Sequence, residues 1–374
     1  MPQPGLHPIS AAGLLVTDWC SARCRHCYVS SGPAGAAWTT VDAAAAHLAA
    51  LARLGVPAAG IHIGGGEPFG DFDRLMEIVR AAREMGSGAL RFAAPDPFSR
   101  AAFRAPTVRS AAVSNDPDLT VGARAPRSSG AVGYVETNGF WATDAQIVRE
   151  RLRALAEAGM MQLSISADPY HQEFVPPERV RLLYDVAREV LGADRVRARR
   201  WKWLQDPRDV AAMAEPARLD LFRTFLARYP ERITGRAAEM LAPLLPRQPL
   251  EEIPREGCRK PILESSHVHI DPAGWVYPGT CAGIVLGRAT PDWPLDRLLA
   301  ECRLADRPLL AALVDGGPRS LADLAARHGF RPDAAGYASK CHLCWAARKS
   351  LVRARAGGET LMPESLYAGG VRDS

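Results

Sequence analysis

One stretch near the amino end decides how this chain folds: residues 14–27, which read LLVTDWCSARCRHC. An apolar run typical of a buried strand leads directly into three cysteines with the spacing Cys20-x3-Cys24-x2-Cys27. Three thiolates in one short loop can bind three irons of a cubane [4Fe–4S] cluster and leave the fourth iron without a protein ligand. The alternative is a partial zinc site or incidental thiols. A structural zinc needs four ligands, however, and only His26 is close enough to add.

Composition narrows the class of protein. The chain has 374 residues, 47% of them hydrophobic, which fits one large α/β domain plus a smaller one. No apolar run is long enough to span a bilayer, and we recognise no signal peptide. The net charge of +5 comes from scattered arginines, which favours a solvated surface over a nucleic-acid partner. Eight cysteines without an export signal favour metal ligation in a reducing cytosol, so we predict a cytoplasmic protein.

Apolar and amphipathic segments alternate from residue 14 to about residue 203, which predicts βα units and a parallel sheet. We expect strands over residues 14–17, 60–63, 132–136, 161–166 and 195–203, with 267–270 as a sixth strand or the opening of a second domain. We expect helices over residues 41–54, 72–85, 143–158, 180–191 and 220–228. Thr39 or Thr40 should cap the first helix and Gly86 should stop the second. Thr143 and Gln146 should form a capping box for the third helix, which stops at Gly159.

Strand after strand ends in a polar or glycine-rich cluster, which favours an open or closed barrel with its site at the carboxyl edge of the sheet. We divide the chain into a core over residues 1–245 and a small cysteine-rich domain over residues 246–374, joined by a proline-rich stretch at 242–254. Residues 87–130 are rich in Pro, Ala, Arg and Ser and show no sustained period. We interpret them as a flexible insertion that could cover the site.

The second expected strand ends in Gly64-Gly65-Gly66-Glu67-Pro68. This turn matches neither the dinucleotide-binding pattern nor a P-loop, but glycines let a backbone approach a ligand closely. The three spaced cysteines, the aromatic Tyr28 after the third, and GGGEP one helix later together resemble the radical S-adenosylmethionine (SAM) superfamily. The resemblance covers roughly residues 14 to 205.

This resemblance implies a partial (βα)6 TIM-like barrel in which Cys20, Cys24 and Cys27 ligate a [4Fe–4S] cluster. In this family the unique iron chelates the amino and carboxylate groups of SAM. An electron from the cluster then cleaves SAM to a 5′-deoxyadenosyl radical that abstracts hydrogen from a substrate. The backbone of Gly64–Gly66 would face the SAM amino group, and Glu67 would anchor either the turn or the ligand.

The resemblance places further, less specific cofactor contacts at the ends of later strands. Ser166 and Asp168 would contact the SAM ribose or carboxylate, although a strand-end Ser or Asp is often just a helix cap. Arg199, or Arg197, could pair with the carboxylate as a bidentate fork. The cluster Thr137-Asn138-Gly139 also sits at the expected active edge, and so do Tyr170 and His171, which would reach the substrate or cover the rim.

A second set of cysteines follows the proline-rich stretch: Cys258, Cys281, Cys341 and Cys344. A β-hairpin over residues 267–280 would deliver Cys281, and the layout resembles the SPASM or twitch modules of radical SAM enzymes. It departs from them in having six residues between Gly274 and Cys281, where four are usual, and in lacking the long cysteine-rich tail. We therefore expect one auxiliary [4Fe–4S] cluster, with a four-cysteine zinc site as the alternative. Cys302 is left over, as a buried thiol or as a hydrogen-atom donor.

The sequence thus predicts a radical SAM enzyme that carries out a redox modification assisted by the auxiliary cluster. The expected partners are a small-molecule or peptide substrate and an electron donor such as flavodoxin or ferredoxin, with no nucleic acid and no membrane. One alternative is a redox-neutral epimerisation or rearrangement of a peptide or sugar-like substrate. Another is a non-catalytic iron–sulfur electron-transfer protein, which would explain the cysteines but not GGGEP.

Overall fold

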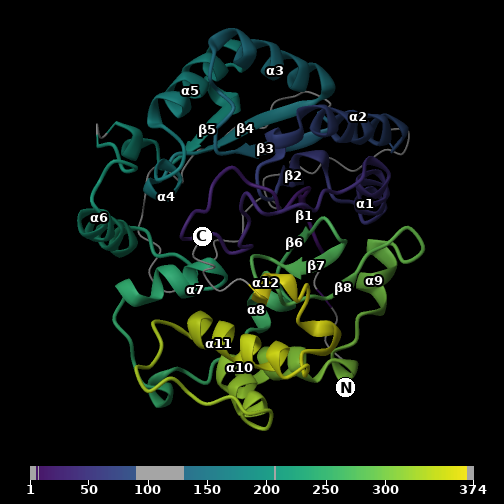
Figure 1. Ribbon diagram of the computed structural model, residues 1–374. Coiled ribbons are helices and arrows are strands. Elements are labelled where there is room, and N and C mark those ends of the chain that lie inside the picture. Colours follow the sequence, from purple (N-terminus) through teal and green to yellow (C-terminus); the bar gives the residue numbers. More distant parts are fainter. Residues whose placement is uncertain (1–5, 7, 90–129, 206–207, 369–374) are drawn as a thin grey trace, which may run out of the picture.

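The computed structural model describes residues 6, 8–89, 130–205 and 208–368 (Figure 1). Its strands form one eight-stranded sheet within these residues, in the order β5-β4-β3-β2-β1-β6-β7-β8. Strands β1 to β6 pair in parallel, and β7 and β8 are added antiparallel at one edge. Their bounds are β1 (Ala11–Leu15), β2 (Ile61–Gly64), β3 (Val132–Thr137), β4 (Met160–Ser166), β5 (Val196–Arg199), β6 (His267–Ile270), β7 (Trp275–Pro278) and β8 (Gly287–Arg288). The predicted α/β class with a parallel sheet is confirmed.

The sixth parallel strand, β6, lies beside β1 and also opens the predicted hairpin with β7. The sheet therefore continues past residue 245, where we expected the core to end, and the division into two domains stays a prediction. The strands do not follow one another across the sheet in chain order, because β1 lies in the middle, between β2 and β6. Strand β5 lies at one edge of the sheet, and the hairpin extends the other edge.

Strand β5 is shorter than predicted, because the chain turns away at Arg200, whose φ of 66° lies in the left-handed region. A short 3-10 turn, Trp201–Leu204, follows. The ring of Trp201 stacks on Tyr184 with centroids 3.8 Å apart, and Trp203 packs edge-on against Phe225. The aromatic residues that resembled a continuing strand are thus used to pack against neighbouring helices.

The helices of the first part are α1 (Val41–Arg53), α2 (Phe72–Ala89), α3 (Ala145–Ala158), α4 (Pro169–Gln172), α5 (Pro177–Leu191), α6 (Glu215–Arg228) and α7 (Arg236–Met240). Thr40 caps α1 by accepting a hydrogen bond from the Ala43 N–H. Helix α2 continues past Gly86, so the predicted stop there was wrong. Helix α3 ends as predicted at Gly159, whose φ of 114° favours glycine.

The predicted capping box of α3 was wrong, because Asp144 is the N-cap in place of Thr143. One carboxylate oxygen of Asp144 accepts hydrogen bonds from the backbone N–H groups of Gln146 and Ile147, at 2.7 and 3.2 Å. Asp144 lies one residue closer to the helix, so its short side chain reaches these two free donors.

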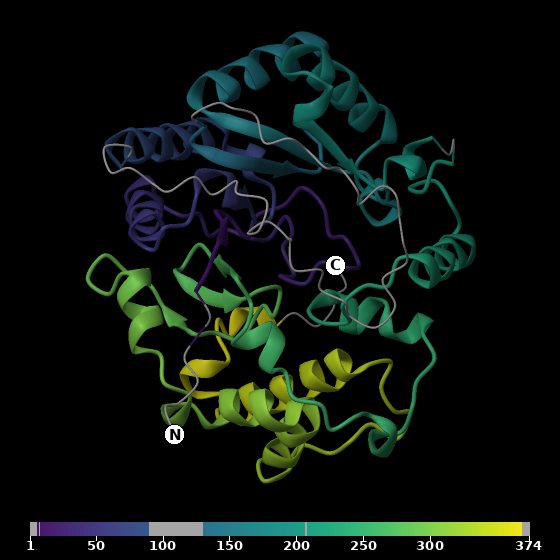
Figure 2. The ribbon, with the colours of Figure 1, turned by 180° about the vertical axis from the view of Figure 1, so that it is seen from behind.

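Helices α2, α3 and α5 lie side by side across one face of the sheet, at the top of Figure 1, and Figure 2 shows the same layer from behind. Alternate strand residues such as Ile63, Val135, Leu163 and Ile165 are fully buried in this apolar layer. The intervening positions face the other side of the sheet, where Gly13 of β1 lies against the rings of His62 and His269. The face of the sheet opposite these helices therefore carries polar side chains, and a polar lining suits a binding site better than a hydrophobic core.

The remaining helices are α8 (Arg259–Ile262), α9 (Leu295–Glu301), α10 (Pro308–Ala326), α11 (Lys340–Arg353) and α12 (Ser365–Ala368). Helices α8, α10, α11 and α12 gather in the lower half of Figure 1, beneath β6 and β7, and α9 lies beside β8. None of the helices in the described part of the chain is both long and apolar enough to cross a lipid bilayer. Of the predicted insertion over residues 87–130, the first three residues end α2 and residues 90–129 lie outside the described residues.

The cap of α3 gives a stability test. Replacing Asp144 with alanine removes the acceptor for two helix N–H groups, and such losses cost about 1 kcal/mol of stability. We expect Asp144→Ala to lower the thermal midpoint, measured by circular dichroism. Thr143→Ala is the matched control and should leave the midpoint unchanged. Equal effects of the two variants would contradict the assignment of the cap.

Candidate functional site

The cysteine loop begins where β1 ends, and it lies beside the glycine turn at the end of β2. The backbone N–H of Gly66 donates to the carbonyl of Thr17 at 2.7 Å, and that of Glu67 donates to the carbonyl of Trp19 at 2.8 Å. A Cβ atom on Gly66 would lie only 1.9 Å from the Trp19 carbonyl oxygen. Gly65 has a φ of 122°, which favours glycine. Glycine is therefore required at both positions, at Gly66 by the close contact with the cysteine loop and at Gly65 by the backbone angle.

Glu67 ties the same turn to the end of β3. Its side chain is fully buried and accepts hydrogen bonds from the Asn138 N–H at 2.7 Å, the Thr137 hydroxyl at 2.9 Å and the Phe69 N–H at 3.2 Å. Burial raises the pKa of Glu67 to about 7. Of the two roles that the sequence left open for Glu67, these contacts are those of an anchor for the turn. Its direct contact with a cofactor stays a prediction.

The three cysteines lie at this carboxyl edge. Cys20 and Cys24 are buried, and Cys27 is half-buried. The sulfur of Cys20 accepts a hydrogen bond from the Ala22 N–H at 3.4 Å, and the Asn138 amide lies 3.6 Å from it. Burial raises the pKa of the Cys20 thiol to about 12 and that of Cys24 well above its usual value. Such thiols ionise when they bind a metal, because the cation replaces the lost hydration.

Arg236, at the start of α7, holds the loop from the other side. Its guanidinium donates to the carbonyls of Cys24, Ser30 and Ser31 at 3.2, 2.7 and 2.6 Å. Its positive charge also lowers the pKa of Cys20 and Cys24, against the larger effect of burial. We did not identify Arg236 from the sequence. It lies some two hundred residues after the cysteines, and no motif marks it.

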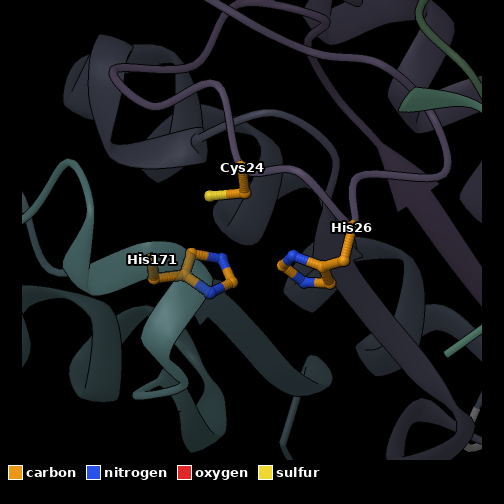
Figure 3. Close-up of side chains that lie close together, drawn as sticks. All are labelled: Cys24, His26 and His171. Carbon is orange, nitrogen blue, oxygen red and sulfur yellow. The ribbon is translucent and has the colours of Figure 1, made fainter. Parts of the chain in front are cut away.

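Two histidines lie beside Cys24, as Figure 3 shows: His26 from the same loop and His171 from α4. One ligand atom of each of the three residues lies within 4.8 Å of the others. The ring of His26 stacks on Tyr170 with centroids 4.8 Å apart, and burial lowers the pKa of His26 to about 4. The Nδ1 of His26 and the hydroxyl of Tyr170 are buried without a hydrogen-bond partner. These polar atoms indicate a site that accepts a further group.

Asp168 has the structural role that we gave as the alternative. It caps α4 by accepting hydrogen bonds from the Tyr170 and His171 N–H groups, and its second oxygen lies 2.8 Å from the His171 Nδ1. Although burial raises it, the neighbouring His171 and His26 lower the pKa of Asp168 overall. Its charge raises the pKa of Cys24, so it lies near the cysteines as well as capping the helix.

The other predicted strand-end residues come together at the same edge. Ser166 and Arg199 are register partners on β4 and β5, whereas Arg197 pairs two residues earlier, with Ser164. The Arg199 guanidinium lies near three carboxylates, those of Glu136, Asp168 and Glu231, which raise its pKa although desolvation opposes them. We did not identify Glu136 or Glu231 from the sequence. Glu136, the next-to-last residue of β3, lies with its carboxylate oxygen directly over Gly64, so it links the glycine turn to Arg199.

The four later cysteines, Cys258, Cys281, Cys341 and Cys344, gather in one place, because the charges of the other three raise the pKa of the Cys258 thiol. Arg232 donates to the sulfur of Cys281 at 3.0 Å. Arg348 is almost fully buried against Cys344 and donates to the Ala282 carbonyl and the Thr234 hydroxyl. Its Nε has no hydrogen-bond partner, and the groups that raise its pKa are Tyr367, Cys344 and Cys281, none of them a carboxylate. An anionic group at the cysteines would compensate this buried charge.

Cys302 lies elsewhere, at the end of α9. Its sulfur is 3.7 Å from the Leu286 carbonyl, and burial raises the pKa of its thiol. It lines a pocket of about 550 Å³ together with Arg303 and Arg307, and none of the other seven cysteines lines this pocket. Its predicted role as a hydrogen donor stays a prediction.

Comparison with known proteins finds a family similarity in the part of the chain that holds the first site. Residues 14–192 match the family model described as the radical SAM superfamily. Over these residues the chain resembles a radical SAM domain. This domain includes the three spaced cysteines, the glycine turn and strands β2 to β4, and the parallel sheet is consistent with a partial TIM barrel. It supports SAM-dependent radical chemistry at a [4Fe–4S] cluster in general terms, and it indicates an enzyme.

Two solved structures are similar over most of the chain. BtrN in complex with AdoMet and 2-DOIA is 16% identical, with a TM-score of 0.38, over 83% of this chain and 89% of that one. A structure of SeMet BtrN in an open conformation is 14% identical, with a TM-score of 0.35, over 83% of this chain and 87% of that one. No curated protein matches the chain significantly. Similarity at this level does not bear on the substrate of the radical SAM domain.

The contact between the glycine turn and the cysteine loop predicts a loss of bound iron. The methyl group of Gly66→Ala would collide with the Trp19 carbonyl and displace the loop. After anaerobic reconstitution, we expect this variant to bind less iron and sulfide per chain than the wild type. The control is Gly55→Asn, because a Cβ there meets nothing within 4 Å and asparagine tolerates a positive φ. Full iron loading of Gly66→Ala would contradict the account.

Proposed function

We propose that this protein is a radical SAM enzyme that reductively cleaves S-adenosylmethionine and abstracts hydrogen from a substrate, in a redox modification assisted by a second iron–sulfur cluster. The proposal depends on one observation, the hydrogen-bonded contact between two loops at the carboxyl edge of the sheet. A loop with three cysteines is hydrogen-bonded along a turn of three glycines, inside a radical SAM domain. Residues 1–245 would form the core and residues 246–374 the auxiliary module.

The first cysteines suit a cluster better than a single metal ion. Sulfur ligands of one tetrahedral zinc, with bonds of about 2.3 Å, lie about 3.8 Å apart. Among the described residues, Cys20, Cys24 and Cys27 do not form a group with sulfurs mutually within 4.8 Å. A cubane binds each thiolate on a separate iron and so needs wider spacing. When bound, such a cluster supplies the electron that breaks the sulfonium bond of SAM.

The protein's own residues would bind and orient the cofactor. The carbonyls of Gly65 and Gly66 accept no backbone hydrogen bond within the described chain, so they are available to an ammonium group. Arg199, flanked by Ser166, supplies a guanidinium for a carboxylate. The unpartnered His26 Nδ1 and Tyr170 hydroxyl supply polar contacts next to Cys24. Arg236 offsets the negative charge of the thiolates and of any cluster they bind.

The second set of cysteines supports an auxiliary cluster. In the part of the chain that the structure describes, no three of these four sulfurs lie mutually within 4.8 Å, which disfavours zinc as it does at the first site. Arg232 and Arg348 bring two positive charges to the four cysteines, and a [4Fe–4S] cluster with four thiolates carries a net negative charge. Four protein ligands leave no open iron, so this cluster would accept or supply an electron.

The segment from Glu231 to Arg236 contacts both cysteine sets. This favours a redox role for the second cluster. Arg232 bonds Cys281 and Arg236 bonds the loop at Cys24, only four residues further along. An extended chain rises at most about 3.6 Å per residue, so the two sites are held close together. The substrate would be a small molecule or a peptide, and the external electron donor a flavodoxin or ferredoxin.

The proposal predicts SAM cleavage that depends on the first cysteines. Reconstituted, dithionite-reduced wild-type protein should release 5′-deoxyadenosine from SAM, measured by chromatography. Cys24→Ser should reduce this product to background, because the loop loses one of only three iron ligands. Arg23→Ala is the control: Arg23 lies exposed on the same loop and should be dispensable. Iron-loaded wild-type protein that yields no 5′-deoxyadenosine would instead favour a non-catalytic electron-transfer protein.

The auxiliary cluster predicts the metal content. Two cubanes give about eight iron and eight sulfide per chain. The double variant Cys341→Ser/Cys344→Ser should retain about half of each, because it keeps only the first site. Cys302→Ser is the matched control and should keep the full content, since Cys302 lies outside the four-cysteine set. Wild-type protein with about four irons, and with a tightly bound zinc that the Cys341→Ser/Cys344→Ser variant loses, would show that the second site is a zinc site.

A further inference from the structure

Three histidines that the proposed reaction does not use face one another inside the barrel. His62 lies on β2, and His267 and His269 lie on β6, the two strands on either side of β1. One ring nitrogen of each lies within 4.8 Å of the others. Gly13 of β1 makes room for them, because a Cβ there would lie 2.4 Å from the His62 Nε2 and 2.5 Å from the His269 Cδ2. The strands therefore bring the three rings together over a position where only glycine fits.

The spacing of the nitrogens suits a single metal ion. The Nε2 atoms of His267 and His269 are 3.4 Å apart. Two imidazole nitrogens bound at about 2.0–2.1 Å to one tetrahedral ion lie about 3.3–3.4 Å apart. A hydrogen bond between the two rings would allow a similar distance, but it would leave His62 without a role in the group. A shared ion engages all three.

The surroundings orient the rings for metal binding. The Nδ1 of His269 lies 2.5 Å from the Gly279 carbonyl, so it carries the proton and leaves the Nε2 lone pair directed at the other two rings. Metal-binding histidines are typically held in this way, with the second nitrogen bonded to a carbonyl or carboxylate. His62 stacks flat on Tyr134, at 4.7 Å. Burial lowers the pKa of all three imidazoles.

We propose that His62, His267 and His269 bind one divalent transition-metal ion, with zinc as the expected occupant, at a site separate from both cysteine sets. Three imidazoles suit zinc and related ions, whereas magnesium and calcium prefer oxygen ligands. Three protein ligands also leave the fourth position of a tetrahedral ion open, as in catalytic zinc sites. That position would take water or an oxygen atom of a bound molecule. Glu136 lies near His267, and its negative charge raises the pKa of that imidazole against the larger effect of burial.

The test is element-specific, so iron at the cysteines does not interfere. The reconstituted holoenzyme is incubated with zinc sulfate, passed over a chelating resin, and examined by elemental analysis and zinc K-edge X-ray absorption. We expect about one retained zinc per chain, with nitrogen ligands at about 2.0–2.1 Å and the outer-shell scattering of imidazole. His62→Ala and His267→Ala should each lose this zinc while they keep their iron and sulfide.

His47→Ala is the matched control, because His47 is a buried histidine of α1 outside the group, and this variant should keep the zinc. Iron content and the thermal midpoint show whether a variant has folded, and His267, the more exposed of the two, is the less disruptive position. Three outcomes would overturn the proposal: no retained zinc in the wild type, zinc bound by sulfur at about 2.3 Å, or zinc that survives in the folded histidine variants.

Discussion

The arrangement of this site depends on a backbone contact between two loops. The glycine turn after β2 donates two hydrogen bonds to the start of the cysteine loop after β1, and at Gly66 the two backbones are too close for any side chain. Glu67, buried in the same turn, extends this link to the end of β3 through the Asn138 N–H. The position of the three cysteines is therefore fixed by neighbouring strands of the sheet.

A second constraint comes from the segment between α6 and α7, which ties distant parts of the chain together. Glu231 and Arg232 are neighbours in the chain but face different cysteine sets. Glu231 lies near Arg199 and Asp168, beside the first cysteines. Arg232 donates a hydrogen bond to Cys281 of the second set. Gly235 approaches the Tyr28 carbonyl so closely that a Cβ would lie 2.5 Å from it, and Arg236 then bonds the loop. The positive charges of this segment balance the negative charge that thiolates and iron–sulfur clusters would bring into a poorly hydrated region.

Sequence patterns predicted the parts of this structure that depend on local chemistry. The cysteine spacing, the glycine turn, the strand periodicity and the hairpin before Cys281 all follow from neighbouring residues, and the α/β class was predicted correctly. The patterns failed where distant contacts decide. Trp201 and Trp203 resembled a strand, but they pack on helices, and Asp144 displaced Thr143 as a cap by being one residue nearer. Arg236, Glu136 and Glu231 could not be found, because only the folded chain brings them to the cysteines. The pairing of β6 with β1, which assembles the three histidines, is likewise a property of the topology.

The central claim is that the first cysteine loop holds an iron–sulfur cluster with one iron left for SAM, and electron paramagnetic resonance tests it most directly. Spectra of the dithionite-reduced holoenzyme would be recorded before and after addition of SAM, with the Cys341→Ser/Cys344→Ser variant used to remove the signal of the second set. The account predicts that SAM changes the g values of the remaining cluster signal, because the cofactor becomes a ligand of its open iron. A reduced cluster signal that SAM leaves unaltered would contradict it.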